Sequence, residues 1–471
     1  MDTGSQSRMD VKSRKYHFVG IGGIGTSGLA KMLIGNGAVV SGSDMADSGV
    51  VDNLRQLGAM VAIGHGAENI GVDTDEVVIS AAITAANPEL ARASELGLTI
   101  RKYAEMLGML MDGYAGVAIA GTHGKSTTSA WLSYVLTQAG EEPNYIVGAD
   151  IPQLGGSSGV GNGKCFVAEA CEYDRSFLNL RPDAAVLLNI EQDHLDYYRD
   201  EDDILDAFTE FASGVKDGGV VIANGQDKNT VRVLRRFKSG PNIIQYGMDG
   251  HCDIFARNPM LVDGCYEFDI YHKNNRLGRT RISLPGAFNI LNALAVTAVC
   301  IHAGVDTKMI LEHLGGFTGI DRRLMFKAEI DGITILDDYA HHPTEIRASL
   351  KAIREKYSPE RIWCVFQPHQ YSRTRFLLDD FAESFKLADI TIVPEIYFVR
   401  DTAESKSKVN ARTLVERIGE QGCAALFINE FSGILEHLKN NVKTGDLVVT
   451  MGAGTIWKVA DEYIQWFRDN R

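Results

Sequence analysis

Two glycine-rich segments of this chain have the spacing that lets a backbone hold phosphate groups. The first runs Gly20-Ile21-Gly22-Gly23-Ile24-Gly25 and fits G-x-G-x-x-G between an expected strand, residues 16–19, and an apolar-periodic helix. Its glycines allow a tight turn and let a diphosphate approach the backbone at the helix N-terminus. Asp44 ends the next expected strand, where its carboxylate could accept a hydrogen bond from a ribose hydroxyl. Alone, the pattern predicts a dinucleotide site, with a plain glycine turn and a nucleotide-sugar diphosphate as alternatives.

The second segment, residues 121–128 (GTHGKSTT), carries the G-K-[ST] core of a P-loop directly after the apolar strand 117–120. In a P-loop the backbone N–H groups surround the phosphates, the lysine meets the terminal ones and the hydroxyl ligates Mg²⁺. Those roles would fall to Lys125 and Ser126, although position 119 is Ile where the full pattern has Gly. A chance G-K-S is the alternative. Two phosphate sites exclude a simple dehydrogenase, which has no use for a P-loop lysine.

Candidate metal ligands follow two expected strands of the same region. Glu169 ends the strand 165–168, and His194 lies 25 residues further on, in NIEQDHLDYY. A carboxylate and an imidazole beside a P-loop suit Mg²⁺ or Mn²⁺ bridged to phosphates. One Glu and one His taken alone favour the alternative of a solvated loop pair.

Polar residues also cluster after strands nearer the C-terminus. Residues 337–345 (DDYAHHPTE) follow an apolar strand, and burying so many polar groups is costly unless they are used. Arg373, in residues 366–374 (FQPHQYSRT), would bind a carboxylate or an acyl phosphate. Asn289 and Asn292 could recognise an adenine edge, with a helix N-cap by Asn289 as the alternative.

The composition places these motifs in a multidomain α/β enzyme. The 471 residues suggest about three domains, 45% are apolar, and the net charge of −14 comes without a long basic run, which argues against a nucleic-acid partner. The seven cysteines form no C-x-x-C pair, so they predict reduced thiols. Neither a signal peptide nor a membrane span is expected. We expect a cytoplasmic monomer or homodimer.

Three series of alternating short strands and helices supply the framework. They predict a fold of three α/β domains with mainly parallel sheets, whose strand ends could meet at one cleft. The N-terminal and C-terminal domains are expected to be Rossmann-like, and the central one to be a P-loop-type ATPase. The expected boundaries are a flexible extension at 1–14, then 15–115, 116–321 and 322–471.

These motifs resemble those of the Mur ligases, which build the peptide stem of the bacterial cell wall. Residues 121–127 resemble the family's ATP loop, and HFVGIGGIG with GSD resembles the UDP-binding domain of its alanine-adding branch. Other similar segments are AEACEYDRSFL, DHLDYY, residues 284–293, GIDRR at 319–323 and DDYAHHP, so the resemblance spans residues 15–465. It implies ATP, Mg²⁺ or Mn²⁺, UDP-N-acetylmuramate and L-alanine as ligands, and no nicotinamide cofactor.

The resemblance also assigns roles to residues. The implied metal ligands are Ser126, Glu169 and His194, and the implied catalytic residues are Lys125, His194, His341 and Arg373. The implied ATP-binding residues are Gly121, Thr122, His123, Gly124, Lys125, Ser126, Thr127, Asn289, Asn292, Arg323 and Asp338. The implied substrate-binding residues are Gly20, Gly22, Gly23, Ile24, Gly25, Asp44, His65, Ser80, His123, Tyr339, His341 and Arg373.

The chain departs from the family pattern at several positions. Cys171, Phe288 and Thr455 stand where the family usually has Asp, His and Asp, and Gln370 stands where some relatives have Arg. Residues 195–215 contain no lysine, so the carbamylated lysine of several sibling ligases has no counterpart, which fits the alanine-adding branch.

The implied reaction forms an amide through an acyl phosphate. The lactyl carboxylate of the sugar attacks the γ-phosphate of ATP, and the amine of alanine then displaces phosphate. His194, His341 and His123 are equal candidates for the general base. The alternatives are a related ligase that recycles a whole tripeptide, an NAD-dependent dehydrogenase built on GIGGIG, and an inactive nucleotide-binding regulator.

Overall fold

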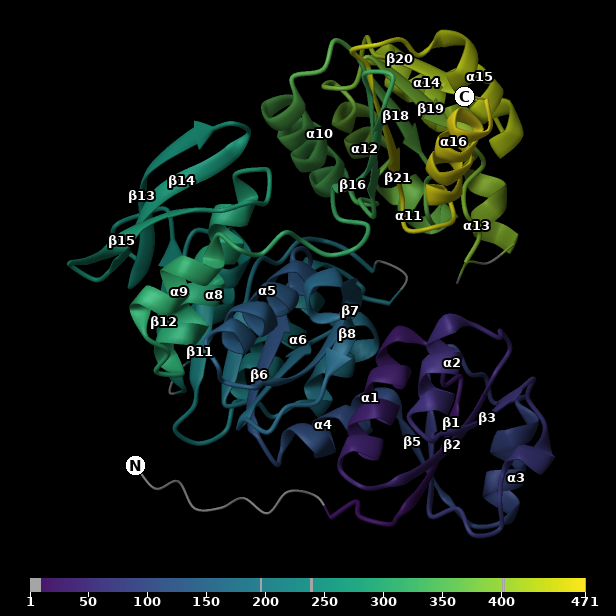
Figure 1. The fold of residues 1–471 in the computed structure, drawn as a ribbon, viewed down its shortest axis with the longest axis vertical. Coiled ribbons are helices and arrows are strands. Elements are labelled where there is room, and N and C mark those ends of the chain that lie inside the picture. Colours follow the sequence, from purple (N-terminus) through teal and green to yellow (C-terminus); the bar gives the residue numbers. More distant parts are fainter. Residues whose placement is uncertain (1–9, 195–196, 238–239, 400, 402, 471) are drawn as a thin grey trace.

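A computed structural model describes residues 10–194, 197–237, 240–399, 401 and 403–470 of the chain. Three sheets occupy the described residues, each with its own helices (Figure 1). This arrangement confirms the predicted α/β fold with mainly parallel sheets. Among the described residues, no helix has both the length and the apolar character needed to cross a membrane.

The first sheet is wholly parallel, in the strand order β3-β2-β1-β4-β5. The order reverses at β1, so the loop after β1 lies at the switch point where open α/β sheets bind ligands. The elements are β1 (Lys15–Val19), α1 (Ile24–Gly35), β2 (Val39–Asp44), α2 (Gly49–Gln56), β3 (Met60–Ile63), η1 (Ala67–Asn69), β4 (Glu76–Ile79), α3 (Pro88–Glu95), β5 (Thr99–Lys102) and α4 (Tyr103–Met111).

The second sheet has ten strands in the order β15-β14-β13-β12-β11-β10-β6-β9-β7-β8. Its middle strands are parallel, and β10 (AAVL) is fully apolar and fully buried, as is typical of a parallel strand covered by helices on both faces. The strands are β6 (Ala115–Ala120), β7 (Asn144–Ile151), β8 (Gly156–Gly159), β9 (Cys165–Glu169), β10 (Ala184–Leu187), β11 (Val220–Asn224), β12 (Asn242–Gly247), β13 (Ile254–Val262), β14 (Cys265–His272) and β15 (Asn275–Arg281). Its helices are α5 (Lys125–Gln138), η2 (Pro152–Leu154), η3 (Tyr173–Asn179), α6 (Glu201–Ser213), α7 (Lys228–Arg235), α8 (Phe288–His302) and α9 (Thr307–Leu314).

The third sheet has the order β16-β17-β21-β18-β19-β20 and is parallel except for the edge strand β16. Its strands are β16 (Met325–Ile330), β17 (Ile333–Asp338), β18 (Ile362–Phe366), β19 (Ile390–Val393), β20 (Ala424–Phe427) and β21 (Leu447–Met451). Its helices are α10 (Pro343–Tyr357), α11 (Tyr371–Phe376), α12 (Leu378–Ser384), α13 (Ala403–Lys408), α14 (Ala411–Glu420), α15 (Phe431–Asn441) and α16 (Trp457–Asp469).

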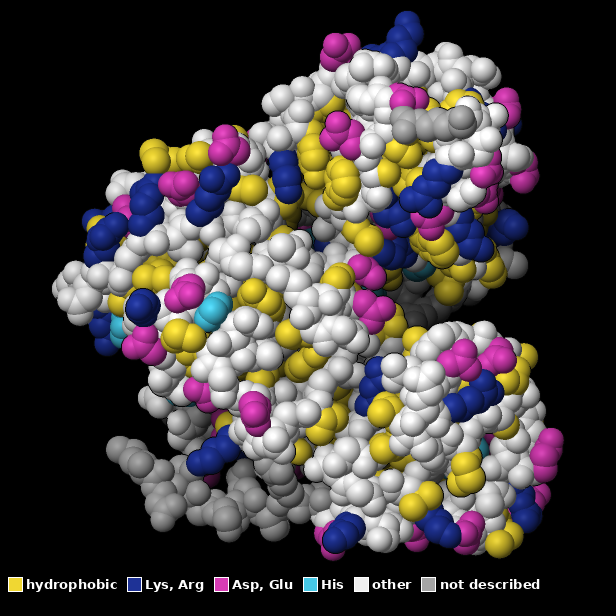
Figure 2. Space-filling model, in the orientation of Figure 1, with side chains coloured by type: hydrophobic (Ala, Val, Ile, Leu, Met, Phe, Trp, Pro, Cys, Tyr) yellow, Lys and Arg dark blue, Asp and Glu magenta, His cyan; other side chains and the backbone are white. Residues whose placement is uncertain are grey.

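The three units touch where the motifs lie. Helix α1 packs against β7 and β8 of the central unit, so closely that a Cβ on Gly28 would come within 3.1 Å of Ile146. The space-filling view shows the surface hollowed between the lobes (Figure 2). Helix α1, which follows the first phosphate loop, therefore contacts the central unit, which carries the second phosphate loop.

Candidate nucleotide and ligation site

The second phosphate loop connects β6 to α5 and is shaped by two glycines. Gly121 has φ +147° and Gly124 has φ +85°, and a Cβ on them would come within 2.9 Å of Leu188 and 3.0 Å of Asn292. Gly124 is the N-cap of α5 and supplies no side-chain cap. The first N–H groups of α5 are therefore free to bind an anion.

Lys125 lies inside this loop with its ammonium group fully engaged. Its Nζ donates to the carbonyls of Gly121 (2.5 Å) and Thr122 (3.1 Å) and lies 3.0 Å from the carboxylate of Glu172. Burial is the largest influence and acts to lower the pKa of Lys125, but the nearby groups, chiefly Glu172, together raise this pKa above the ordinary value. Glu172 was not among the predicted residues, although it lies three positions after Glu169 in the same AEACEYD segment.

The predicted metal ligands come together beside Lys125. The Ser126 hydroxyl bonds to the Glu169 carboxylate, and the imidazole Nε2 of His194 lies 3.7 Å from Glu172. Burial raises the pKa of the Glu169 carboxyl above its ordinary value. Glu169 and His194 are both half-buried. Carboxylate and hydroxyl oxygens are the donors that Mg²⁺ prefers, so these residues fit it.

A second group, His123, Glu191 and His342, places three ligand atoms within 4.8 Å of one another. His123 is already saturated, because its two ring nitrogens lie 3.3 Å from Glu191 and 3.2 Å from Glu345. Burial opposes its charge, but these carboxylates raise the pKa of His123 to about 9. Two imidazoles favour softer metals than Mg²⁺, and here one already holds a proton. The group acts as an ion-pair bridge from the P-loop to α10.

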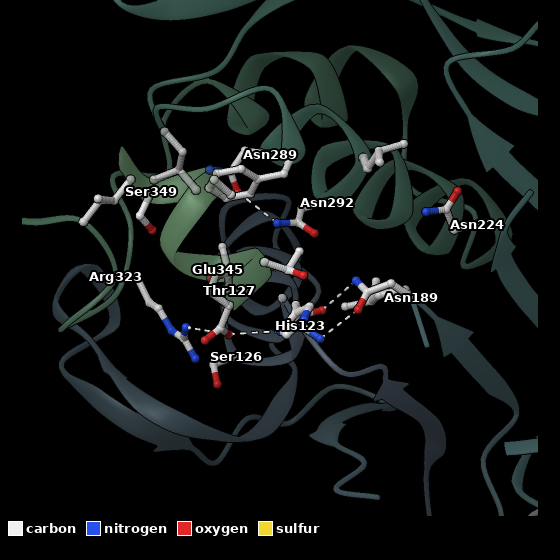
Figure 3. Close-up of a pocket in the computed structure, with 18 of the residues that line it drawn as sticks. His123, Ser126, Thr127, Asn189, Asn224, Asn289, Asn292, Arg323, Glu345 and Ser349 are labelled. Atoms are coloured by element: carbon white, nitrogen blue, oxygen red, sulfur yellow. Dashed lines mark hydrogen bonds and ion pairs between the residues drawn. The ribbon is translucent and has the colours of Figure 1, made fainter. Parts of the chain in front are cut away.

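A cavity of about 380 Å³ opens between the P-loop and the third unit (Figure 3). Its lining includes the predicted ATP-binding residues His123, Gly124, Ser126, Thr127, Asn289, Asn292, Arg323 and Asp338. Asn289 is not the N-cap of α8, because the helix begins at Phe288 with Ala287 as its cap. Instead the Asn289 amide donates to the Pro285 carbonyl (2.7 Å) and accepts from the Asn292 amide (2.9 Å). This pair presents a fixed amide edge to the cavity.

Arg323 and Asp338 face this cavity from the third unit. Arg323 lies 3.4 Å from Glu345, and its neighbour Arg322 donates to Asp337 at 3.0 Å, so the alternative of two solvated arginines is wrong. Asp338 is 2% exposed. Burial raises the pKa of Asp338 to about 6, against the opposing effect of Arg323.

Arg373 and His341 lie at the same junction. Arg373 donates to Asp193 from Nη2 (3.0 Å) and from Nε (3.2 Å), which joins α11 to the loop that carries His194. His341 Nδ1 lies 3.0 Å from the Tyr339 carbonyl, and burial lowers the pKa of His341 to about 3. The ring of Tyr339 lies 5.1 Å from the Arg323 guanidinium. Tyr339 and His341 directly follow β17, whereas Arg373 comes from α11, which follows β18.

The first phosphate loop lies apart from that cavity, between β1 and α1. Gly20 has φ +79°, and a Cβ there would come within 2.9 Å of Ser80 Oγ. The N–H of Gly22 donates to Asp44 Oδ2 at 2.8 Å, while Gly23 caps α1 without a side chain. The first N–H groups of α1, from Ile24 and Gly25, are thus also available to an anion. None of these residues lines the central cavity.

Tyr103 was not predicted, yet it lies between the two loops. A Cβ on Gly25 would come within 2.9 Å of the Tyr103 hydroxyl. Burial, together with the negative charge of Glu169, raises the pKa of Tyr103. No motif marks this position, because the contact depends on how α4, which begins at Tyr103, packs against α1.

Three family models match the chain in sequence order. They are the Mur ligase family catalytic domain at residues 15–115, the Mur ligase middle domain at 119–300 and the Mur ligase glutamate ligase domain at 322–454.

Curated relatives match over nearly the full length. A UDP-N-acetylmuramate–L-alanine ligase from Caldanaerobacter subterraneus subsp. tengcongensis is 42% identical, over 96% of this chain and 98% of its own. One from Acetivibrio thermocellus is 41% identical, over 96% of each chain.

Solved structures share the fold. UDP-N-acetylmuramate-alanine ligase of Thermotoga maritima superposes with a TM-score of 0.81 at 26% identity, covering 97% of this chain and 100% of that one. A murein peptide ligase of Psychrobacter arcticus has a TM-score of 0.71 at 24% identity, over 97% and 99% of the two chains.

Proposed function

Because the chain belongs to the Mur ligase family, we propose that it is the ATP-dependent ligase that joins L-alanine to UDP-N-acetylmuramate in peptidoglycan precursor synthesis. The observation that carries this proposal is that relatives about 41% identical to the chain match nearly its full length. In agreement with them, the P-loop opens into a cavity lined by residues of the central and third units. A dehydrogenase is not supported, since it leaves the Lys125 site without a role.

ATP is proposed to lie in the 380 Å³ cavity with its phosphates on the P-loop. The Asn289–Asn292 edge would meet the adenine, and Asp338 would accept from the ribose. Arg323 would approach the phosphates, leaving its 3.4 Å contact with Glu345. Lys125 would exchange its contact with Glu172 for the terminal phosphate, because both are oxygen anions and the ammonium is already in place.

A Mg²⁺ ion held by Ser126, Glu169 and His194 would neutralise charge on the transferring phosphoryl group. Glu172 lies between Lys125 and His194, so its carboxylate would keep both oriented.

The first step would form the activated acid. The lactyl carboxylate attacks the γ-phosphorus in line, the bond to the β,γ-bridging oxygen breaks, and the products are an acyl phosphate and ADP. UDP held by the Gly20–Gly25 loop would orient the sugar, and Tyr103 would lie along its path to the P-loop.

The second step would form the amide. The alanine amine attacks the acyl carbon and phosphate leaves, while the amine gives up a proton. His123 already holds a proton in this state because its pKa is raised to about 9. His341 is neutral, but burial lowers its pKa to about 3, so in this state it is a weak base. Arg373, anchored by Asp193, would hold the carboxylate of alanine or the acyl phosphate.

The test is ADP release on mixing the enzyme, ATP, Mg²⁺ and UDP-N-acetylmuramate with L-alanine, each other amino acid, or the cell-wall tripeptide. We expect turnover with L-alanine. Turnover with the tripeptide alone would assign the recycling activity instead, and no ADP release with any amine would refute a ligase.

A further inference from the structure

A buried polar relay leads from the interior of the first unit to His65, at the edge that carries the first phosphate loop. Its centre is Glu89 on α3, whose side chain is 0% exposed. His65 follows β3, and the N–H of Gly64 donates to the Asp44 carbonyl at 2.8 Å, so His65 lies at the carboxyl edge of the sheet. The predicted UDP site uses the same edge.

The carboxylate of Glu89 is saturated by four donors. Oε1 accepts from the Gly66 N–H (3.1 Å) and the Asn69 amide (2.7 Å), while Oε2 accepts from the Ser43 hydroxyl (2.7 Å) and faces His17 Nε2 (3.3 Å). Burial alone would raise the pKa of Glu89, but these bonds lower it to about 2. Glu89 is therefore ionised and can only accept hydrogen bonds.

This arrangement fixes the direction of every proton in the relay. Ser43 has one hydroxyl proton, and it goes to Glu89. The Ser43 oxygen also lies 2.9 Å from His65 Nδ1, so in that contact Ser43 must accept and Nδ1 must donate. A neutral His65 then has its proton on Nδ1 and a lone pair on Nε2. Because its side chain keeps 16% of its surface exposed, that lone pair can meet a ligand.

We infer that Ser43 and Glu89 are positioning residues that make His65 Nε2 a hydrogen-bond acceptor for the nucleoside of the substrate. The inference rests on the proposed function. A lone-pair acceptor is repelled by phosphate oxygens, so its partner is a donor group of uridine. Uridine offers two kinds, the imide N3–H of the base and the ribose hydroxyls.

The spectroscopic test reads the tautomer directly. Nitrogen-15 NMR of histidine-labelled protein at pH 8, where an ordinary imidazole is neutral, should show His65 with its proton on Nδ1, assigned by comparison with His65→Gln. In Ser43→Ala this preference should weaken. An Nε2–H tautomer or an imidazolium in the wild type would overturn the inference.

The binding test uses UDP and three analogues: N3-methyl-UDP, 2′-deoxy-UDP and 3′-deoxy-UDP. Loss of about tenfold in affinity with one analogue identifies the donor, since one net hydrogen bond is worth about that factor. Equal affinity for all four overturns the inference. Ser43→Ala should bind UDP about tenfold more weakly and raise KM for the sugar nucleotide at unchanged kcat.

The matched control is Ser41→Ala, which removes the 2.9 Å contact of Ser41 with His17 on the other side of Glu89 and leaves the relay intact. It should bind UDP as the wild type does, and equal losses in both serine variants would overturn the specific role of Ser43. ADP release by the wild type tests the ligase itself. If the wild type releases no ADP but binds UDP and carries the His65 proton on Nδ1, the proposed ligase activity is refuted and the inference about the relay still holds.

Discussion

The two phosphate loops of this molecule share a backbone plan and differ in the charges around it. Each joins a buried parallel strand to a helix whose cap is a glycine with no side-chain cap. In the first, Gly22 donates to a carboxylate, Asp44, and no ammonium is within hydrogen-bond distance among the described contacts. In the second, Lys125 is surrounded by Glu172 and the loop carbonyls, with Glu169 beside it.

This difference in charge distinguishes a site that binds a phosphate group from one that transfers it. Backbone N–H groups at a helix N-terminus suffice to hold a diphosphate that does not change. Transfer of a phosphoryl group develops charge that must be neutralised, which requires a cation already in position. The first loop is thus built for binding and the second for chemistry, and each can be altered without the other.

The largest expected effect follows from removing the ammonium of the second loop. Lys125→Ala should lower kcat by about 10³-fold, the scale of losing one preorganised electrostatic contact to the transition state. Binding of UDP-N-acetylmuramate, measured by calorimetry, should change little, because the first loop does not use Lys125. The control is Lys308→Ala at the exposed start of α9. Retained ligation in Lys125→Ala would contradict the assigned role.

The converse change crowds the first loop. A Cβ on Gly22 would come within 2.9 Å of Asp44 Oδ2 and 3.3 Å of Val51, and would fill the approach of the diphosphate. Gly22→Ala should raise KM for UDP-N-acetylmuramate about tenfold, equivalent to about 1.4 kcal/mol, and leave kcat and KM for ATP near the wild-type values. Steady-state kinetics with each substrate varied would test this.

Gly49→Ala is the matched control for that variant, because a Cβ at this position in α2 meets nothing within 4 Å. A parallel rise in KM for ATP would mean that the two loops are coupled, which contradicts the separation argued here.

Sequence alone could identify both loops, because glycine spacing, a preceding apolar strand and a following helix are all local features. It also predicted strands at 117–120 and 165–168, and these residues lie within β6 and β9 of the structure. The sheets follow because alternating strands and helices leave few ways to cover both faces.

Sequence could not supply the contacts that depend on packing between units. Glu172, Tyr103 and the Arg373–Asp193 pair owe their roles to neighbours more than 25 positions away. The N-cap alternative for Asn289 is wrong for a related reason. A cap is decided by where the helix begins, and α8 begins at Phe288 with Ala287 as its cap.

Asp338 allows a pH test that should affect only the ATP side of the comparison. Burial raises the pKa of Asp338 to about 6, so the carboxylate loses its charge as the pH falls through that value. KM for ATP should then rise about threefold to tenfold between pH 7 and pH 5, since up to one pKa unit corresponds to about 1.4 kcal/mol. In Asp338→Asn this rise should be absent. KM for UDP-N-acetylmuramate should not follow the same titration, and if it does, the effect is not local to Asp338.

The smallest expected effect concerns the stability of the fold. It compares the ion pairs of His123, beside the second loop, with the Glu89–Ser43 hydrogen bond of the first unit, whose charge does not change with pH. The pKa of His123 is raised to about 9, so its ion pairs with Glu191 and Glu345 stabilise the fold fully below the unfolded pKa of about 6.5. That contribution is lost as the pH rises through 9. Glu89 has a pKa of about 2, so the carboxylate that accepts from Ser43 stays ionised over this pH range.

The unfolding free-energy difference between wild type and His123→Gln should therefore be on the order of 1 kcal/mol at pH 6 and shrink toward pH 9. The difference for Ser43→Ala should stay flat over this range. Urea denaturation at pH 6, 7.5 and 9 measures both, and a His123→Gln difference that does not depend on pH would show that the bridge is uncharged.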